Sequence, residues 1–337
     1  MAPGPASRRP LGVNPTERVK LGRTTLEVTR LGFGTAPLGG LFEALADDDA
    51  HEVVEAAWSA GLRFYDTAPQ YGNGLAEQRL GAVLSTKPRD EFVLATKVGR
   101  LLRAGAPKES DTFPGAPPLN PVFDFSYDGV MRSVEESVTR MGIDRIDILH
   151  IHDPDEHFAE ALAGAYPALD RLRKEGTIKA VGAGMNQAEM LARFAREANF
   201  DCFLLAGRYT LLDQVGLKEL LPLCVERGIA IIAGGVFNSG ILADPKPGAH
   251  YNYQAAPAEL VRRAARIKAV CERHGVSQKA VAIQFPLGHR AIPTVLTGCR
   301  SADELNENVE AFRSPIPTGV WEDLKAEGLL VAEAPVP

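Results

Sequence analysis

The sequence predicts an α/β fold, a (β/α)8 TIM barrel with an N-terminal hairpin and long βα loops. Its 337 residues hold about eight short apolar runs of strand length that alternate with segments of helical spacing. The runs are apolar throughout, which is typical of parallel strands covered on both faces. Eight such units in a chain of this length favour a closed barrel over an open sheet.

The expected elements follow one another in regular order. Gly22 lies between two short apolar runs at 19–20 and 26–28, which indicates a hairpin. The strands are expected at 30–35, 62–66, 91–97, 143–152, 178–183, 201–205, 229–233 and 292–296. The helices are expected at 50–60, 75–85, 127–140, 157–175, 187–198, 215–227 and 277–288. The acidic run Asp47–Asp49 suits the positive end of the first helix.

Two irregular stretches, 101–124 and 244–257, interrupt the alternation after the third and seventh strands. Loops this long are usually functional or disordered, so we expect walls of a substrate pocket, with mobile surface excursions as the alternative. Residues 1–15 are rich in Pro, Gly and Arg without an apolar signal core, and predict a disordered arm. Residues 16–337 are then expected to form a single barrel domain.

Charge and cysteine usage limit the partners and the compartment. The net charge of -6 gives no basic surface for nucleic acid or for anionic membranes. The four cysteines are widely spaced and predict neither a disulfide framework nor a zinc site. We therefore expect a cytoplasmic protein, a monomer or homodimer, that acts on a small molecule and binds no metal.

Polar side chains gather where apolar strands end. Asp66, Lys97 and His152 each end an expected strand, Asp153 follows, and Tyr71 lies in the loop after Asp66. A buried lysine needs a carboxylate, and Asp66 on the next strand is well placed to pair with Lys97. The ammonium would also lower the pKa of Tyr71 from its usual value of about 10. This is a proton-transfer site without an electron carrier, as hydride transfer to a nicotinamide requires.

These residues belong to motifs that resemble the aldo-keto reductase family. The motifs are L-G-R-T at 21–24, L-G-F-G-T at 31–35, D-T-A-x-x-Y-G at 66–72, A-T-K at 95–97, I-D-I-L-H-I-H-D-P at 146–154 and a cofactor motif at 301–308. The resemblance implies a barrel that uses NAD(P)H. It also implies a catalytic tetrad in which Tyr71 is the acid or base, Lys97 tunes it, Asp66 holds Lys97 and His152 orients the substrate oxygen.

Two alternatives to an aldo-keto reductase remain, a metal-dependent hydrolase and a non-catalytic subunit. His150 and His152 lie on one face of a strand, and with Asp153 or Asp66 could bind a metal in a barrel hydrolase. Lys97 would repel such a cation, so we expect His150 to form the pocket floor below His152. The chain could also be a non-catalytic cofactor-sensing subunit, although its tetrad is intact.

The cofactor contacts depart from the family pattern. The family's Ser-Asn pair is Gly184-Met185 here, and its Gln and its stacking aromatic are Ala206 and Gly234. The nicotinamide is therefore expected on Asn186, Tyr209 or Phe237. The remaining cofactor-binding residues that we expect are Gly34, Thr35, Asp66, Asn238, Gly298, Arg300, Glu307 and Asn308.

The cofactor is expected to be NAD, with NADP possible. Gly298 and Glu304 occupy the positions of the basic residues that many family members direct at the 2′-phosphate. The carboxylates of Asp303 and Glu304 would repel a phosphate, whereas Arg300 could still attract it.

Several segments resemble the branch of sugar dehydrogenases and pyridoxal dehydrogenases, among them 125–133, 182–187 and 237–240. The resemblance implies oxidation of the anomeric hydroxyl of an L-fucose, D-arabinose or L-galactose type aldose to its lactone. Oxidation of pyridoxal, or general reduction of aldehydes and ketones, is the alternative. Asp153, His150 and Arg208 are the expected substrate contacts.

Overall fold

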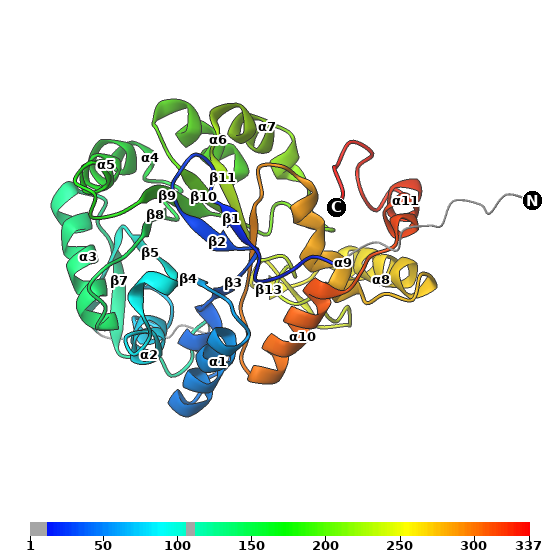
Figure 1. Cartoon of the computed structure of the whole chain (residues 1–337), viewed down its shortest axis with the longest axis horizontal. Helices are drawn as coiled ribbons and strands as arrows, with labels where there is room; N and C mark the ends of the chain where they lie inside the picture. Colours follow the sequence, from blue (N-terminus) through cyan, green and yellow to red (C-terminus); the bar gives the residue numbers. More distant parts are fainter. Residues whose placement is uncertain (1–11, 106–111) are drawn as a thin grey trace, which may run out of the picture.

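The computed structural model describes residues 12–105 and 112–337, and its eight parallel strands close into a barrel (Figure 1). Each strand hydrogen-bonds to two neighbours, and β14 pairs with β3 to complete the ring. The strands are β3 (Leu31–Gly34), β4 (Phe64–Asp66), β5 (Val93–Val98), β8 (Ile148–His152), β9 (Ala180–Met185), β10 (Cys202–Ala206), β11 (Ala230–Gly234) and β14 (Thr294–Thr297). The expected fold and the order of its strands are confirmed.

The strands begin one to five residues later than the apolar runs suggest, and most end within one or two residues of them. The clearest case is β8, which begins at Ile148 although the apolar run starts at Ile143. Asp147 interrupts that run, and its Oδ2 accepts hydrogen bonds from the backbone N of Leu94 and from Arg89 at 2.8 and 2.6 Å. The side chain of Asp147, just before β8, therefore hydrogen-bonds to the backbone of the neighbouring strand β5.

Helices surround the barrel, with α2, α3 and α5 on one side and α8, α10 and α11 on the other (Figure 1). Their bounds are α1 (Asp47–Ser59), α2 (Leu75–Leu84), α3 (Tyr127–Met141), α4 (Phe158–Glu160), α5 (Tyr166–Lys174), α6 (Ala188–Glu197), α7 (Leu220–Arg227), α8 (Ala258–Arg273), α9 (Gln278–Gln284), α10 (Ala302–Arg313) and α11 (Thr318–Ala326). A π-helical turn joins α4 to α5, so the single helix expected at 157–175 is three consecutive segments.

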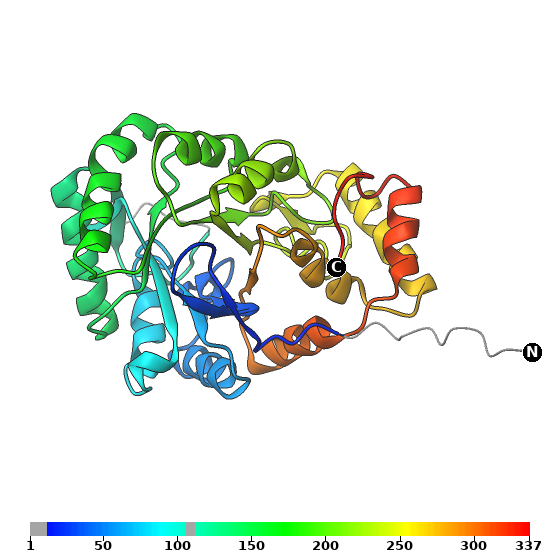
Figure 2. The same cartoon turned by 45° about the horizontal axis from the view of Figure 1, so that its top comes forward.

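The predicted hairpin consists of β1 (Arg18–Lys20) and β2 (Glu27–Thr29), and it lies across one end of the barrel (Figure 2). Leu21 and Val28 of this hairpin pack into the same buried cluster as residues inside the barrel, such as Phe64 and Ile232. The hairpin therefore closes the end where the strands start. The open end is the one where they finish, as in other barrels of this kind.

Each irregular stretch forms a two-stranded antiparallel hairpin that is separate from the barrel sheet. The first is β6 (Arg100–Ala104) paired with β7 (Leu119–Phe123), and the second is β12 (His250–Tyr251) paired with β13 (Gln254–Ala255). Both follow barrel strands, so they stand at the open end of the barrel.

Of the expected arm at 1–15, residues 1–11 lie outside the described residues. Val13 packs against the core, and the backbone N of Leu31 donates to the carbonyl of Pro15 at 3.0 Å. In the part of the chain that the structure describes, no helix is long and apolar enough to cross a membrane.

Candidate active site

Three neighbouring strands carry the polar residues of the site. Asp66 is the last residue of β4, Lys97 lies near the end of β5, and His152 is the last residue of β8. β5 pairs with β4 on one side and with β8 on the other. The barrel register therefore gathers all three side chains at the open end.

Lys97 and Asp66 form a buried ion pair. Nζ of Lys97 lies 2.6 Å from Oδ2 of Asp66 and donates a second hydrogen bond to the carbonyl of Thr67 at 2.8 Å. Lys97 is 1% exposed and Asp66 is 3% exposed. A charge buried this deeply requires a partner, and the pair fixes the ammonium in place.

Tyr71 lies above this pair, in the tight loop between β4 and α2. Its ring centroid is 4.7 Å from Nζ of Lys97 and 5.8 Å from the ring of His152, at an interplanar angle of 87°. The loop turns at Gly72, whose φ is 60° and where a Cβ would clash with the backbone of Gly39. A glycine is thus required next to Tyr71, and the tetrad residues are brought together.

Burial and charge set the protonation of these groups. Burial raises the pKa of Tyr71 to about 12, although the Lys97 ammonium acts in the opposite direction. The sequence predicted that the Lys97 ammonium would lower the pKa of Tyr71. This expectation is corrected, because the desolvation of the partly buried phenol outweighs the effect of the ammonium. Burial alone would lower the pKa of Lys97, but Asp66 and Tyr71 raise it above its ordinary value, so Lys97 stays charged.

Both histidines of the H-x-H pair are neutral. Burial, with the charges of Lys97 and Arg100, holds the pKa of His152 well below its usual range. Burial and Lys97 lower the pKa of His150 to about 3. Nε2 of His152 faces Oδ2 of Asp153 at 3.5 Å, which favours the tautomer with its proton on Nε2.

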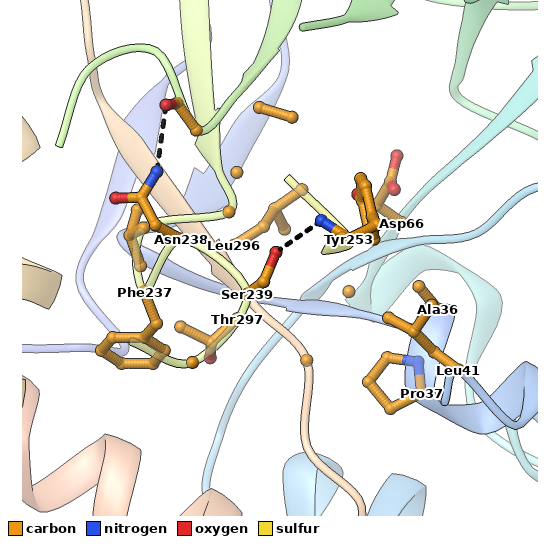
Figure 3. Close-up of a pocket in the computed structure, with 18 of the residues that line it drawn as sticks. Ala36, Pro37, Leu41, Asp66, Phe237, Asn238, Ser239, Tyr253, Leu296 and Thr297 are labelled. Carbon is orange, nitrogen blue, oxygen red and sulfur yellow. Dashed lines mark hydrogen bonds between the residues drawn. The ribbon is translucent and has the colours of Figure 1, made fainter. Parts of the chain in front are cut away.

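The open end holds a cavity of two adjoining lobes that meet at Tyr71. The first lobe, about 240 Å³, lies beside the ends of β3, β11 and β14 (Figure 3). The second, about 260 Å³, lies over Lys97 and His152. Both lobes share Tyr71, Asn186 and Tyr253 as lining residues. Tyr71 therefore forms part of the wall of both lobes.

The first lobe is lined by glycines and by polar atoms without partners. Figure 3 shows Asn238 donating to the carbonyl of Gly207, and Ser239 accepting from the backbone N of Tyr253, each at 3.2 Å. Four buried polar atoms that line this lobe have no hydrogen-bond partner among the described residues, namely Thr35 Oγ1, Asp66 Oδ1, Asn238 Oδ1 and Thr297 Oγ1. Buried polar groups are rarely left unpaired, so this lobe fits an elongated polar ligand.

The structure brings seven of the expected cofactor residues to this lobe and places four elsewhere. Those that line it are Gly34, Thr35, Asp66, Asn186, Phe237, Asn238 and Gly298. Tyr209 is buried with its ring stacked on Phe285, with centroids 4.9 Å apart. Asn308 donates to Sγ of Cys299 at 3.1 Å.

Arg300 and Glu307 also lie outside the lining. The guanidinium of Arg300 donates to the carbonyls of Leu41, Glu43 and Ala44 at 2.9 to 3.2 Å. Arg300 thereby fixes the loop after β3. Glu307 pairs with Lys279 at 3.0 Å.

The second lobe contains Asp153 from the expected substrate contacts. His150 is fully buried outside this lining, and both its ring nitrogens lack partners among the described residues. Arg208 donates to Oδ1 of Asn252 at 2.9 Å and so supports the β12–β13 hairpin.

The two irregular stretches expected to form pocket walls do line this lobe, through Thr112 and Phe113 of the first and Tyr253 of the second. Sequence reasoning missed Gln70, which also lines it, and Arg100, which pairs with Asp153 at 2.9 Å. A search for a cation to balance Asp153 could have found Arg100, three residues after Lys97.

Comparisons with known proteins show that the chain is an oxidoreductase. Residues 30–327 match the model of the Aldo/keto reductase family, and the chain belongs to this family, whose members use NAD(P)H. The unpaired polar atoms of the first lobe fit the amide and ribose groups of such a cofactor. Among the described residues, no group of three or more His, Cys, Asp or Glu side chains could hold a metal ion, and the comparisons give no support for a hydrolase.

Three of the relatives are named as dehydrogenases and match this chain over at least 91% of their own length. The chain is 47% identical to D-threo-aldose 1-dehydrogenase of a Pseudomonas species over 91% of this chain and 95% of the relative. It is 44% identical to pyridoxal 4-dehydrogenase of Microbacterium luteolum, over 94% and 98%. L-galactose dehydrogenase of Arabidopsis thaliana is 31% identical, over 91% of each chain.

Solved structures share the fold. An aldo-keto reductase from Bacillus halodurans in its holo form superimposes with a TM-score of 0.74 over 96% of this chain and 98% of that one, at 23% identity. At this identity the similarity shows the barrel architecture alone.

Proposed function

We propose that this enzyme is an NAD-preferring aldose 1-dehydrogenase that oxidises the anomeric hydroxyl of an L-fucose, D-arabinose or L-galactose type sugar to the lactone. The observation that carries the proposal is the position of Tyr71 on the wall between the two lobes, above Lys97 and beside a neutral His152. The similarity to D-threo-aldose 1-dehydrogenase supports the substrate class.

Each tetrad residue has one task in this reaction. Nε2–H of His152 donates to the anomeric oxygen and orients it. The phenolate form of Tyr71, which is the minor form at neutral pH because its pKa is raised, takes the proton of that hydroxyl while C1 loses its hydride and becomes the carbonyl carbon of the lactone. The bound nicotinamide supplies the hydride acceptor. Lys97, held by Asp66, stabilises the phenolate form of Tyr71.

Preference for NAD is supported by the charges that follow Gly298, the last residue along the chain that lines the first lobe. Arg300 already donates to three backbone carbonyls, and its own backbone N donates to Oε2 of Glu304 at 2.8 Å. A 2′-phosphate would meet that carboxylate without a free guanidinium, whereas a ribose diol can donate to it.

Pyridoxal is the second candidate substrate. The similarity to pyridoxal 4-dehydrogenase supports it, and so do the rings of Tyr71 and Phe113, whose centroids lie 6.4 Å apart at the second lobe. An aromatic substrate could stack against such rings.

We also propose that residues 16–337 act as one domain, in the cytoplasm, as a monomer or homodimer. The described cysteines are all buried and free, as is usual in a reducing compartment.

The test is formation of reduced nicotinamide, followed by its ultraviolet absorbance, with L-fucose, D-arabinose, L-galactose and pyridoxal. Wild type and Tyr71→Phe are compared, and each is assayed with NAD and with NADP. Turnover that falls by about 100-fold or more in the variant supports the proposed role of Tyr71. Turnover on none of the sugars refutes the aldose assignment.

A further inference from the structure

Asp153 has an unusual backbone at the edge of the substrate lobe. It follows β8 directly, lines the second lobe and has a φ of 42°. Its backbone N donates to the carbonyl of Gly184 at 3.0 Å, which holds this left-handed conformation. Asp tolerates such a φ better than most residues do, so the bend keeps an acid here at little cost.

Arg100 fixes the carboxylate of Asp153. Nη2 of Arg100 lies 2.9 Å from Oδ2 of Asp153, and the guanidinium packs over the ring of Phe123, 4.5 Å from its centroid. Arg100 is the first residue of β6 and pairs with Phe123 of β7, so the hairpin sets the position of the guanidinium. Among the described residues no hydrogen bond reaches Oδ1 of Asp153, which leaves that oxygen for a ligand.

The carboxylate of Asp153 lies close enough to His152 for the two side chains to bind oxygens on adjacent carbons. Oδ2 of Asp153 lies 3.5 Å from Nε2 of His152, the atom assigned to the reacting oxygen. The oxygens of a gauche vicinal diol are separated by about one hydrogen-bond length. When one oxygen contacts His152, the neighbouring hydroxyl can therefore donate to Asp153, which as a carboxylate only accepts.

We infer that Asp153, positioned by Arg100, binds the hydroxyl on the carbon next to the reacting carbon, so that the enzyme selects hemiacetals with a free 2-hydroxyl. The inference rests on the proposed function and narrows its substrate class. A 2-deoxy sugar leaves the carboxylate unpaired, and pyridoxal has no hydroxyl on the carbon next to its hemiacetal carbon. Sites built to hydrogen-bond a hydroxyl discriminate strongly against analogues without it.

The test compares kcat/KM for L-fucose and 2-deoxy-L-fucose at saturating nicotinamide cofactor. Wild type is expected to prefer L-fucose by about 10-fold to 150-fold, the range for a hydrogen bond to a charged group. Asp153→Ala and Arg100→Met should reduce that ratio to within about 3-fold of unity, and Arg100→Lys should restore part of it. Arg103→Met is the matched control, because Arg103 also lies in β6 and pairs at 2.9 Å with Glu136, away from the lobe. In Arg103→Met the ratio of kcat/KM for L-fucose to kcat/KM for 2-deoxy-L-fucose should equal that of the wild type.

The outcomes separate this inference from the proposed function. If wild type turns over L-fucose but Asp153→Ala lowers kcat/KM equally for both sugars, the inference is wrong and the function stands. The same holds if wild type already accepts both sugars equally. If wild type oxidises no aldose, the proposed function fails and the inference falls with it.

Discussion

The ring of Phe42 stacks on the ring of His250, with centroids 5.3 Å apart, and so joins the loop after β3 to the hairpin after β11. Tyr253 of the same hairpin lies 6.1 Å from Phe42. Phe42 and Tyr253 both line the first lobe, where we propose that the cofactor binds, so the contact forms part of its wall.

Phe42→Ala is expected to speed the release of reduced cofactor. Aromatic pairs contribute about 0.5–1.5 kcal/mol beyond their buried area, so the dissociation rate should rise by about 2-fold to 10-fold. Stopped-flow nicotinamide fluorescence measures this rate. Val331→Ala, at another exposed apolar side chain, is the control. An unchanged rate in Phe42→Ala would show that the contact does not retain the cofactor.

Arg300→Met is expected to weaken NAD and NADP binding by a similar factor. The side chain holds Leu41, Glu43 and Ala44 through their carbonyls, so its loss loosens a wall that either cofactor contacts. Titration calorimetry should give a decrease of about 3-fold to 10-fold for both. Arg313→Met removes an arginine whose ion pair with Glu310 is exposed, and serves as the control. A selective loss of NADP binding would instead assign Arg300 to the 2′-phosphate.

Lys97→Met is expected to destabilise the fold and abolish turnover. Asp66 then has to be charged without a partner or protonated, and breaking a buried pair costs about 3–5 kcal/mol. Urea denaturation measures the free energy of unfolding. The double variant Lys97→Met, Asp66→Asn should regain most of the stability and none of the activity. A single variant as stable as wild type would contradict a paired carboxylate.

Stability should fall at acid pH because of the two neutral histidines. The unfolded chain protonates them near pH 6.5, whereas folding lowers the pKa of His150 to about 3 and that of His152 well below 6.5. Their contribution is therefore complete above pH 6.5 and declines below it, by about 1.4 kcal/mol per pH unit for each histidine. In His150→Asn the slope of the unfolding free energy against pH should decrease by about 1.4 kcal/mol per pH unit, which is the contribution of one proton. Equal slopes would show that His150 is protonated in the folded protein.

The barrel and the tetrad were predictable because both depend on local patterns. Apolar strands that end in Asp66, Lys97 and His152 appear directly in the sequence, and the parallel order of the strands brings their ends together. By contrast, α8 was not predicted, because its sequence is rich in polar residues and it does not alternate with a barrel strand. Strands β12 and β13 were not predicted either, because two residues each are too few to show a periodic pattern.

Contacts made by residues outside the ring of strands could not be predicted. Arg100 and Asp153 are separated by 53 positions, and they meet where the chain leaves the paired strands β5 and β8, with Arg100 already in the β6–β7 hairpin. The sequence also shows that an ammonium lies near Tyr71, but not how completely the phenol is enclosed, which decides the direction of its pKa shift. The burial of Tyr71 depends on residues from many parts of the chain that come together around the two lobes.

The two hairpins at the open end have a consequence for how this enzyme could be altered. The proposed proton transfer uses residues from β4, β5 and β8 and the loop after β4, which are fixed by the barrel. Arg100 and Tyr253, by contrast, come from excursions outside the ring of strands. Exchange of those excursions between homologous chains should transplant substrate preference while the reaction chemistry stays intact. Variation and laboratory evolution can therefore explore new sugars at these two segments without disturbing the barrel.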